Sequence, residues 1–414
     1  MLDLIKLAHQ MQGIGQHLSQ EAAASRQRLE LAQQLLGQAR EHQADLLSQQ
    51  QTWRDRLGFT AAEPLEPLDT QVSLTAAPEQ HSVMATDGSQ IAPSHHEIAY
   101  CYLINVGRVA LHYGQNRHPL LDSIPEVFYR PEDLYISRQW GIRTEEWMGY
   151  RRTVSEAIVL AEFAREQREE SDRQTNQLAR TGSQKKAEVQ PTSPPCLAMV
   201  DGSLIHWFLE PLPAEARDRI ILPILNAWEQ LRTARIPLVG YLSAARSGEA
   251  LNFLRLYSCP YLTPDCMTHC SGATEQAPCQ VFAPLRDTAL WGLLLAPGQR
   301  GAIWRSSAKI LELYGEHAIC FCYVHMGAEI ARVEFPLWVA QDPELLDIAL
   351  SLTLTQVQKG YGYPVALAEA HNQAVVRGGD RARFFALLEQ QMIRAGLKNV
   401  GTSYKEARKR GSIA

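Results

Sequence analysis

The sequence predicts a mixed α/β fold with a helical N-terminal extension, and three observations support this. From residue 80 onward, strand-length apolar runs and helical patterns follow the order β-hairpin, helix, strand, helix, strand, loop, β-hairpin, helices. Residues 2–56 contain no proline and carry apolar residues at helical spacing. Two short apolar runs, "SVMATDGSQI" and "CLAMVDGSLI", each lead into Asp-Gly-Ser.

Length and composition limit the class of protein. With 414 residues, 45% of them hydrophobic, the chain can bury one large core or two ordinary ones. The formal net charge of −5 gives no global basic field, so contact with nucleic acid would rest on local patches or bound cations. The opening residues lack a secretory signal and no segment has 18 uninterrupted apolar residues, so we expect a cytoplasmic protein without a membrane span. In that compartment most of the eight cysteines would be reduced.

The first 60 residues are predicted to form a long helix or a pair of helices. The run "FTAAEPLEPLDTQ" ends this segment with two prolines. Its apolar and small residues form one stripe along the helix, which either packs on the chain's own domain or forms a coiled coil with a partner or a second copy. Its members are Met11, Ile14, Leu18, Ala22, Ser25, Leu29, Ala32, Leu36 and Ala39.

Strands are expected between residues 80 and 114. The first is "SVMATDG", and it is followed by "HEIAYCYLIN" and "GRVALHYG", which we expect to be joined at Val106-Gly107. A helix is expected from Tyr150 to about Arg168. Residues 166–195 are rich in Gln, Ser, Lys and Pro, which predicts a disordered insertion.

The later elements continue the alternation. A strand at Leu197 is followed by a helix from about Ala214 to Arg235 and by the strand "IPLVGYLS". An irregular cysteine-rich insertion covers residues 259–279. Two strands, "AICFCYVHMG" and "EIARVEFPLWV", are followed by a helix from Pro343 to Lys359 and by helix from Pro364 onward. Residues 396–414 form a basic tail.

The two Asp-Gly-Ser sequences suggest a metal site. Taken alone, Asp87 or Asp201 would simply be a turn residue, because Asp caps a turn and the following glycine accepts positive φ. If the two strands are neighbours, however, the carboxylates meet at one edge, where like charges are costly unless a cation lies between them. Converging carboxylate oxygens suit Mg²⁺ or Mn²⁺.

A third carboxylate is available in the helix between the two strands. Glu156 and Glu162 are six residues apart and so lie on different faces. Glu156 follows Arg152 by one turn and precedes an apolar face, which favours it as the third ligand. Glu162 is the reserve, and an exposed helical glutamate is the alternative for Glu156.

The order strand-Asp, helix-Glu, strand-Asp resembles RNase H-like nucleases, in which two divalent ions roughly 4 Å apart act on a phosphodiester. The segment "RVEFPLWVAQDPELLDIALSLTLTQVQKGYGYPVALAEAHNQAVV" resembles the closing segment of the NurA family. These are DNA-end-processing nucleases with an RNase H-like core that work beside the HerA motor ATPase. The family's motifs have counterparts at Asp87, Glu156, Asp201, Tyr363 and His371, so the nuclease domain would span residues 80–395.

The resemblance implies roles for these residues. Asp87, Glu156 and Asp201 would be Mn²⁺ or Mg²⁺ ligands, His371 would bind or polarise the second-metal side, and Tyr363 would orient the scissile phosphate or a base. The helical spacing of His371 with Leu367 and Val375 would also suit a core histidine. Glu369 is then the competing ligand.

The resemblance also implies a function in DNA end resection and repair. It implies a 5′→3′ exonuclease and single-strand endonuclease acting on single-stranded DNA and DNA ends, as a homodimer beside a HerA-like ATPase. The alternatives are a catalytically weak adaptor that regulates such an ATPase, and a phosphoesterase for small nucleotides. The retained carboxylates argue against a pure adaptor.

The sequence departs from the family pattern in two places. A Ser-Lys pair is usual near the third strand, whereas this chain has Ser243 and Ala244, with Arg246 as the nearest substitute cation. The second departure is a cluster of four cysteines. It would hold structural zinc or an iron–sulfur cluster, with His269 as a substitute ligand, or it is an ordinary reduced loop. Its members are Cys259, Cys266, Cys270 and Cys279.

Overall fold

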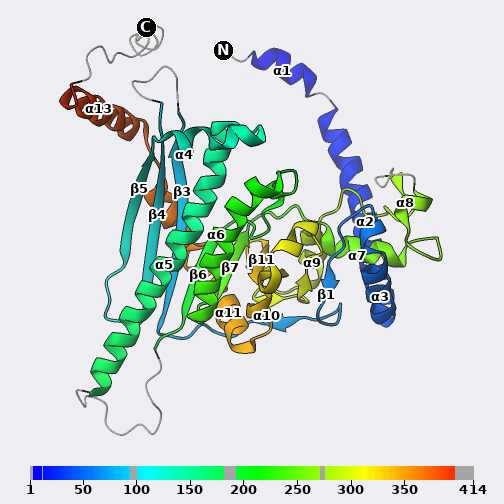
Figure 1. The fold of residues 1–414 in the computed structure, drawn as a ribbon. Helices are drawn as coiled ribbons and strands as arrows, with labels where there is room; N and C mark the ends of the chain where they lie inside the picture. The colour runs from blue at the N-terminus through cyan, green and yellow to red at the C-terminus, as the bar shows by residue number, and fades with distance from the viewer. Residues whose placement is uncertain (1–2, 12, 94–99, 181–192, 271–275, 397–414) are drawn as a thin grey trace. The chain divides into compact units, whose positions relative to one another are not determined.

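The structure is a computed structural model that describes residues 3–11, 13–93, 100–180, 193–270 and 276–396 (Figure 1). The chain forms two compact units, each made of two separate segments. The first unit comprises Met1–Leu74 and Tyr241–Ala340, and the second comprises Thr75–Gly240 and Gln341–Ala414. The carboxylates and the histidine predicted as ligands lie in the second unit, and the four clustered cysteines lie in the first.

The second unit is built on a mixed sheet in the order β7-β6-β3-β4-β5. The long strands β3, β4 and β5 are antiparallel neighbours, whereas β6 runs parallel to β3. Residues such as Val83, Met84 and Ala85 are completely buried at the centre of β3. The strands are β3 (His81–Ile91), β4 (Tyr102–Tyr113), β5 (Leu120–Phe128), β6 (Cys196–Asp201) and β7 (Leu238–Leu242), of which the last two residues of β7 are assigned to the first unit.

Two helices pack on opposite faces of this sheet. Side chains alternate between the faces of a strand. Thr86 and Gly88 of β3 meet α5, whereas Asp87 and Ser89 meet α12. Figure 1 shows α5 lying along β3 and β4. The helices of this unit are α4 (Pro131–Tyr135), α5 (Thr144–Arg180), α6 (Ala214–Thr233), α11 (Pro343–Lys359), α12 (Val365–Ala374) and α13 (Gly378–Arg394).

The first unit combines short strands with seven helices in the described part of the chain. Its main strand pair is β10 with β11, which are antiparallel. The helices are α1 (Leu4–Gln10), α2 (Ile14–Glu41), α3 (Gln43–Trp53), α7 (Glu249–Tyr257), α8 (Cys266–His269), α9 (Asp287–Leu294) and α10 (Leu337–Ala340). The strands are β1 (Glu63–Pro64), β2 (Val72–Ser73), β8 (Gln299–Arg300), β9 (Trp304–Arg305), β10 (Ile319–His325) and β11 (Ile330–Pro336).

The N-terminal helices pack on the chain's own first unit, which is the first of the two alternatives for their apolar stripe. The later part of α2 and α3 contribute Ala32, Leu36 and Leu46 to a buried cluster that includes Phe253 and Trp291. They are therefore part of the first unit's core, because an apolar helix face is stable only when another element covers it. By contrast, Ile14 and Leu18 near the start of α2 are exposed.

The predicted turn at Val106-Gly107 is wrong, because β4 passes through both residues without a break. Gly107 pairs with Asp87, and a Cβ there would lie 2.5 Å from the Ala370 carbonyl oxygen. The glycine thus permits close approach of α12 and does not mark a turn. The sequence also did not predict β5, and residues 94–99 of the expected second strand lie outside the described residues.

The expected disordered insertion is wrong for its first half. Helix α5 continues to Arg180, and ion pairs one turn apart, such as Arg168–Asp172 at 3.4 Å, line its polar stretch. Residues 181–192 lie outside the described part, as do residues 397–414 of the basic tail. The helix expected from Pro364 onward is two helices, α12 and α13. No described helix is long and apolar enough to cross a membrane.

Candidate active site

The two predicted aspartates lie on neighbouring strands. The last parallel pair of β3 and β6 joins Thr86 to Val200, so Asp87 and Asp201 are the next residues along the two strands. Residues in register on parallel strands point to the same face, and here that face carries α12. Asp201 is exposed, whereas the side chain of Asp87 is 25% exposed. The condition for the two carboxylates to meet, that their strands are neighbours, is therefore met.

Glu156 approaches this pair from the α5 side. Its side chain is 20% exposed, and Arg152 Nε lies 3.3 Å from its Oε1. Burial raises the pKa of Glu156 to about 7, and the charges of Asp87 and Asp201 add to the rise, whereas Arg152 opposes it. Glu162 is exposed on another face of the same helix. Glu156 is thus the helical glutamate that shares an electrostatic environment with both aspartates.

The two Asp-Gly-Ser glycines serve different purposes. Gly202 follows the end of β6 with φ 106°, which is the predicted turn. Gly88 lies inside β3, where a Cβ would collide with Glu156 Oε1 and lie 2.7 Å from Arg152 Cγ. Its N–H donates to Asp87 Oδ1 at 2.8 Å and also favours the ionised form of Glu156. Because Gly88 has no side chain, the Glu156 carboxylate can reach the backbone of β3 next to Asp87.

His371 is an exposed partner of Asp87. Its Nδ1 lies 2.7 Å from Asp87 Oδ2, and its side chain is 65% exposed. The alternative of a core histidine is therefore wrong. The C-terminal end of α12 is fixed beside it, because Ser89 Oγ and Asn105 Nδ2 both donate to the Ala374 carbonyl. Sequence reasoning missed Ser89 and Asn105, although Ser89 completes the first Asp-Gly-Ser.

Tyr363 lies near the other end of α12. It lies two residues before the helix begins and eight residues before His371. That end is anchored by Gln356, which accepts from the Ala366 N–H at 3.0 Å and donates to Tyr113 Oη at 3.1 Å. Tyr113 pairs with His81, at the opposite end of β3 from Ile91. The expected role of Tyr363 in orienting the scissile phosphate or a base stays a prediction.

The donor set fits a hard divalent cation in its chemistry. Asp87 and Asp201 supply carboxylate oxygens on one face, and Glu156 supplies a third whose pKa is raised by burial and by these charges. Among the described residues, however, no three His, Cys, Asp or Glu side chains are arranged to hold one ion. Joint ligation would require the Glu156 carboxylate to turn past Gly88 toward the aspartates.

The four clustered cysteines of the first unit surround one small cavity. Its volume is about 10 Å³, and Cys259, Cys266, Cys270 and Cys279 line it together with His269. All four are free thiols. Burial raises the pKa of the Cys270 thiol, and the neighbouring thiols of the cluster add to the rise.

Part of this wall is held in place by other contacts. The Asp265 carboxylate caps α8 and pairs with Arg56 at 2.7 Å. The ring of His269 stacks on Tyr261. Ser243, the retained member of the family's Ser-Lys pair, is also in this unit. Its hydroxyl donates to Glu329 at 2.8 Å, and Arg246 is exposed.

Comparison with known proteins identifies the family. A family model described as the NurA domain matches residues 81–376. The crystal structure of the NurA nuclease from Sulfolobus solfataricus is similar at 11% sequence identity and a TM-score of 0.44, covering 80% of this chain and 89% of that one. No curated protein matches the sequence. Because the NurA domain match covers more than half of the 414 residues, this chain belongs to the NurA family.

Proposed function

We propose that this protein is a divalent-metal-dependent DNA nuclease. The observation that carries the proposal is the approach of three carboxylates, Asp87, Asp201 and Glu156, around Gly88. Carboxylates crowded in this way are stabilised by a cation, and bound Mn²⁺ or Mg²⁺ supplies an activated water and charge stabilisation for phosphodiester hydrolysis. Membership of the NurA family supports the same reaction.

Each residue then has a defined task. Asp87 and Asp201 would hold the metal from the face that carries α12, and Glu156 would complete the donor set. His371 is exposed beside Asp87, so it would contact either the metal or the substrate phosphate. Arg152 forms an ion pair with the Glu156 carboxylate and opposes the rise in its pKa, which favours the ionised form.

The finer parts of the proposal rest on the resemblance to the family. They are a 5′→3′ exonuclease and single-strand endonuclease activity, a role in DNA end resection and repair, and action in the cytoplasm. Homodimer formation and a HerA-like ATPase partner belong to the same group. The exposed residues Ile14 and Leu18 on α2 are compatible with a partner there.

The test is cleavage of a single-stranded oligonucleotide by purified protein with Mn²⁺ or Mg²⁺ and with EDTA. Wild-type protein should cleave only with the metal, whereas Asp87→Asn and Asp201→Asn should be inactive and folded, because each change removes one ligand and one repelling charge. Glu156→Gln should behave alike. Glu162→Gln is the matched control, since it makes the same change on the exposed face of α5.

The same assay separates the alternative functions. If the protein is a phosphoesterase for small nucleotides, a dinucleotide competitor should inhibit it more strongly than a long DNA strand does. An adaptor would show no hydrolysis with any metal. Full activity in either aspartate variant would overturn the metal-site proposal.

We also propose that the four cysteines hold a structural metal. Their convergence on one cavity of about 10 Å³ favours a single zinc ion over a larger iron–sulfur cluster. Because no three ligands in the described residues are arranged for an ion, the thiol side chains would rotate inward on binding.

A further inference from the structure

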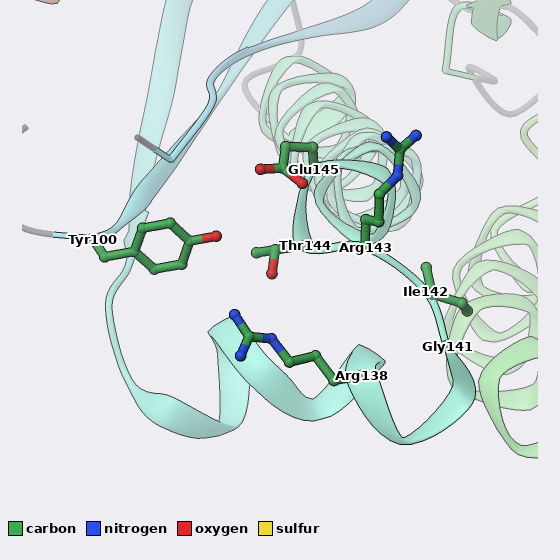
Figure 2. A pocket seen from close by; sticks show the side chains of 7 residues that line it. All are labelled: Tyr100, Arg138, Gly141, Ile142, Arg143, Thr144 and Glu145. Carbon is green, nitrogen blue, oxygen red and sulfur yellow. The ribbon is translucent and has the colours of Figure 1, made fainter. Parts of the chain in front are cut away.

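A pocket lined by charged and polar side chains lies at the start of α5, in the same unit as the carboxylates. Its volume is about 340 Å³, and its lining residues are Tyr100, Arg138, Gly141, Ile142, Arg143, Thr144 and Glu145. Figure 2 shows the Tyr100 hydroxyl, the Arg138 guanidinium and the Glu145 carboxylate around one space. Arg143 lies beyond Thr144, and its guanidinium points away from Arg138 (Figure 2).

The charges of this pocket suit an extended polyanion. Both arginines are exposed, and in the described part of the chain neither forms an ion pair with a carboxylate. Because the two guanidinium groups diverge, they match successive phosphates of a strand better than one isolated phosphate. Glu145 opposes anion binding at this point, so its charge should weaken the site.

Aromatic rings lie beside Arg138. Arg138 lies over the ring of Tyr135 at 4.4 Å, and Tyr135 stacks on Tyr100 with 6.1 Å between centroids. Arginines combined with aromatic rings are typical of surfaces that bind single-stranded nucleic acid, where bases stack and phosphates pair.

Helix α5 joins this pocket to the carboxylates. Glu145, Gly149, Arg152 and Glu156 are spaced four, three and four residues apart, so they form one stripe along the helix. A Cβ at Gly149 would meet nothing within 4 Å, so the stripe is open at its middle. The distance from Glu145 to Glu156 along the axis is about 17 Å, which corresponds to roughly five nucleotides at the B-form rise and fewer for a stretched strand.

We propose that this pocket binds single-stranded DNA a few nucleotides away from the scissile bond, and this rests on the proposed nuclease function. Arg138 and Arg143 each contact one phosphate, and Tyr100 and Tyr135 lie beside the bases. The strand then follows the stripe past Gly149 to the carboxylates.

The first test measures binding alone. Fluorescence anisotropy with labelled dT12 in EDTA should show about tenfold weaker binding at low salt for the double variant Arg138→Ala/Arg143→Ala. The slope of log K against log salt should fall by about 1.4, because two phosphate contacts are lost. Glu145→Gln should bind more tightly. Arg173→Ala, which removes one positive charge near the other end of α5, should bind like wild type.

The second test measures cleavage with Mn²⁺. The double variant should lower the ratio of kcat/KM for dT12 to that for the dinucleotide dT2 about tenfold, because a dinucleotide cannot span the pocket and the carboxylates together. An unchanged ratio and unchanged binding by the double variant would overturn the inference. If wild-type protein cleaves neither strand, the nuclease proposal fails, while the binding test still decides whether the pocket holds DNA.

Discussion

Gly88 and Gly202 occupy the same place in two Asp-Gly-Ser sequences, yet only Gly202 adopts positive φ. At Gly88 the absence of a side chain makes room for Glu156, so the glycine is a contact residue of the site. The sequence motif suggested both aspartates as candidate ligands, because Asp-Gly-Ser at the end of an apolar run can be recognised locally. It could not predict the reason for Gly88, because Glu156 is 68 residues away in the sequence.

His371 should act on the reaction more than on the fold. We expect His371→Ala to lower turnover about 100-fold or more, because a positioned acid, base or ligand contributes about that much. Its stability should change little, since the side chain is 65% exposed. Melting temperature and Mn²⁺-dependent cleavage of single-stranded DNA measure both effects.

Normal cleavage by His371→Ala would instead point to Glu369 as the functional residue of α12. If His371→Ala cleaves normally per folded molecule, His371 has no catalytic role and Glu369, partly buried on the same helix, becomes the residue to replace. Glu369→Gln then takes its place in the same assay.

Helix α12 depends on the small size of Gly107. We expect Gly107→Ala to lower stability by about 1–3 kcal/mol, because the new methyl group would overlap the backbone of α12 at Ala370 and Ala374. Cleavage should fall as well, since His371 moves with the helix. Urea unfolding and the cleavage assay report the two effects.

Gly149→Ala is the matched comparison for Gly107→Ala. It lies inside α5 with no atom within 4 Å of the new Cβ, so it should raise stability by about 1 kcal/mol. Equal effects of the two alanines on stability would show that close packing of α12 on β4 is not the reason for Gly107.

The hairpin of β3 and β4 contains a histidine that should make it sensitive to acid. His112 Nδ1 lies 2.8 Å from Ser82 Oγ, and burial lowers the pKa of His112 to about 4, with a smaller effect from Arg117. The unfolded chain therefore binds a proton at higher pH than the folded chain does. Stability from the neutral ring is complete above about pH 6.5 and is lost as pH falls toward 4.

His112→Gln should remove this loss, because glutamine does not titrate. Its melting temperature relative to wild type should rise as pH falls from about 6.5 to 4. The change is at most about 1.4 kcal/mol per pH unit for a fully buried group, and smaller for this half-buried ring. A constant difference across that range would exclude His112 as an acid-sensitive group.

At the level of elements, local sequence patterns predicted where several helices and strands lie, but they did not predict the length of α5. The helix from Pro343 to Lys359 was predicted correctly, and β10, β11 and α6 lie where expected. The length of α5 was underestimated because its second half is almost entirely polar. Polar residues one turn apart form ion pairs such as Arg165–Glu169, and these support helix where an apolar stripe is lacking.

Across the whole molecule, the division into two units was not predictable from local patterns. Each unit joins segments that are distant in sequence, as when Leu36 of α2 packs in the same cluster as Trp291 of α9. Such long-range packing overrides the appearance of a separate N-terminal extension. The sequence predicted the order of elements, but it did not show which segments share a core.

The first unit provides a test that is independent of catalysis. Protein purified without chelators should contain about one zinc per chain, and Cys266→Ser should lose the zinc and lower the melting temperature more than turnover. Cys320→Ser, which removes a buried thiol of β10 outside the cavity, should keep the zinc. If elemental analysis finds neither zinc nor iron in wild-type protein, the four clustered cysteines are ordinary reduced cysteines and the structural-metal proposal is wrong.

The contact between His371 and Asp87 joins residues 284 positions apart. During synthesis, Asp87, Glu156 and Asp201 leave the ribosome well before α12 does. The nascent chain thus carries its acidic residues for a long interval without the helix that brings His371 to them. A chain terminated before α12 should therefore lack the contact between His371 and Asp87 and, on the proposed function, should not cleave DNA.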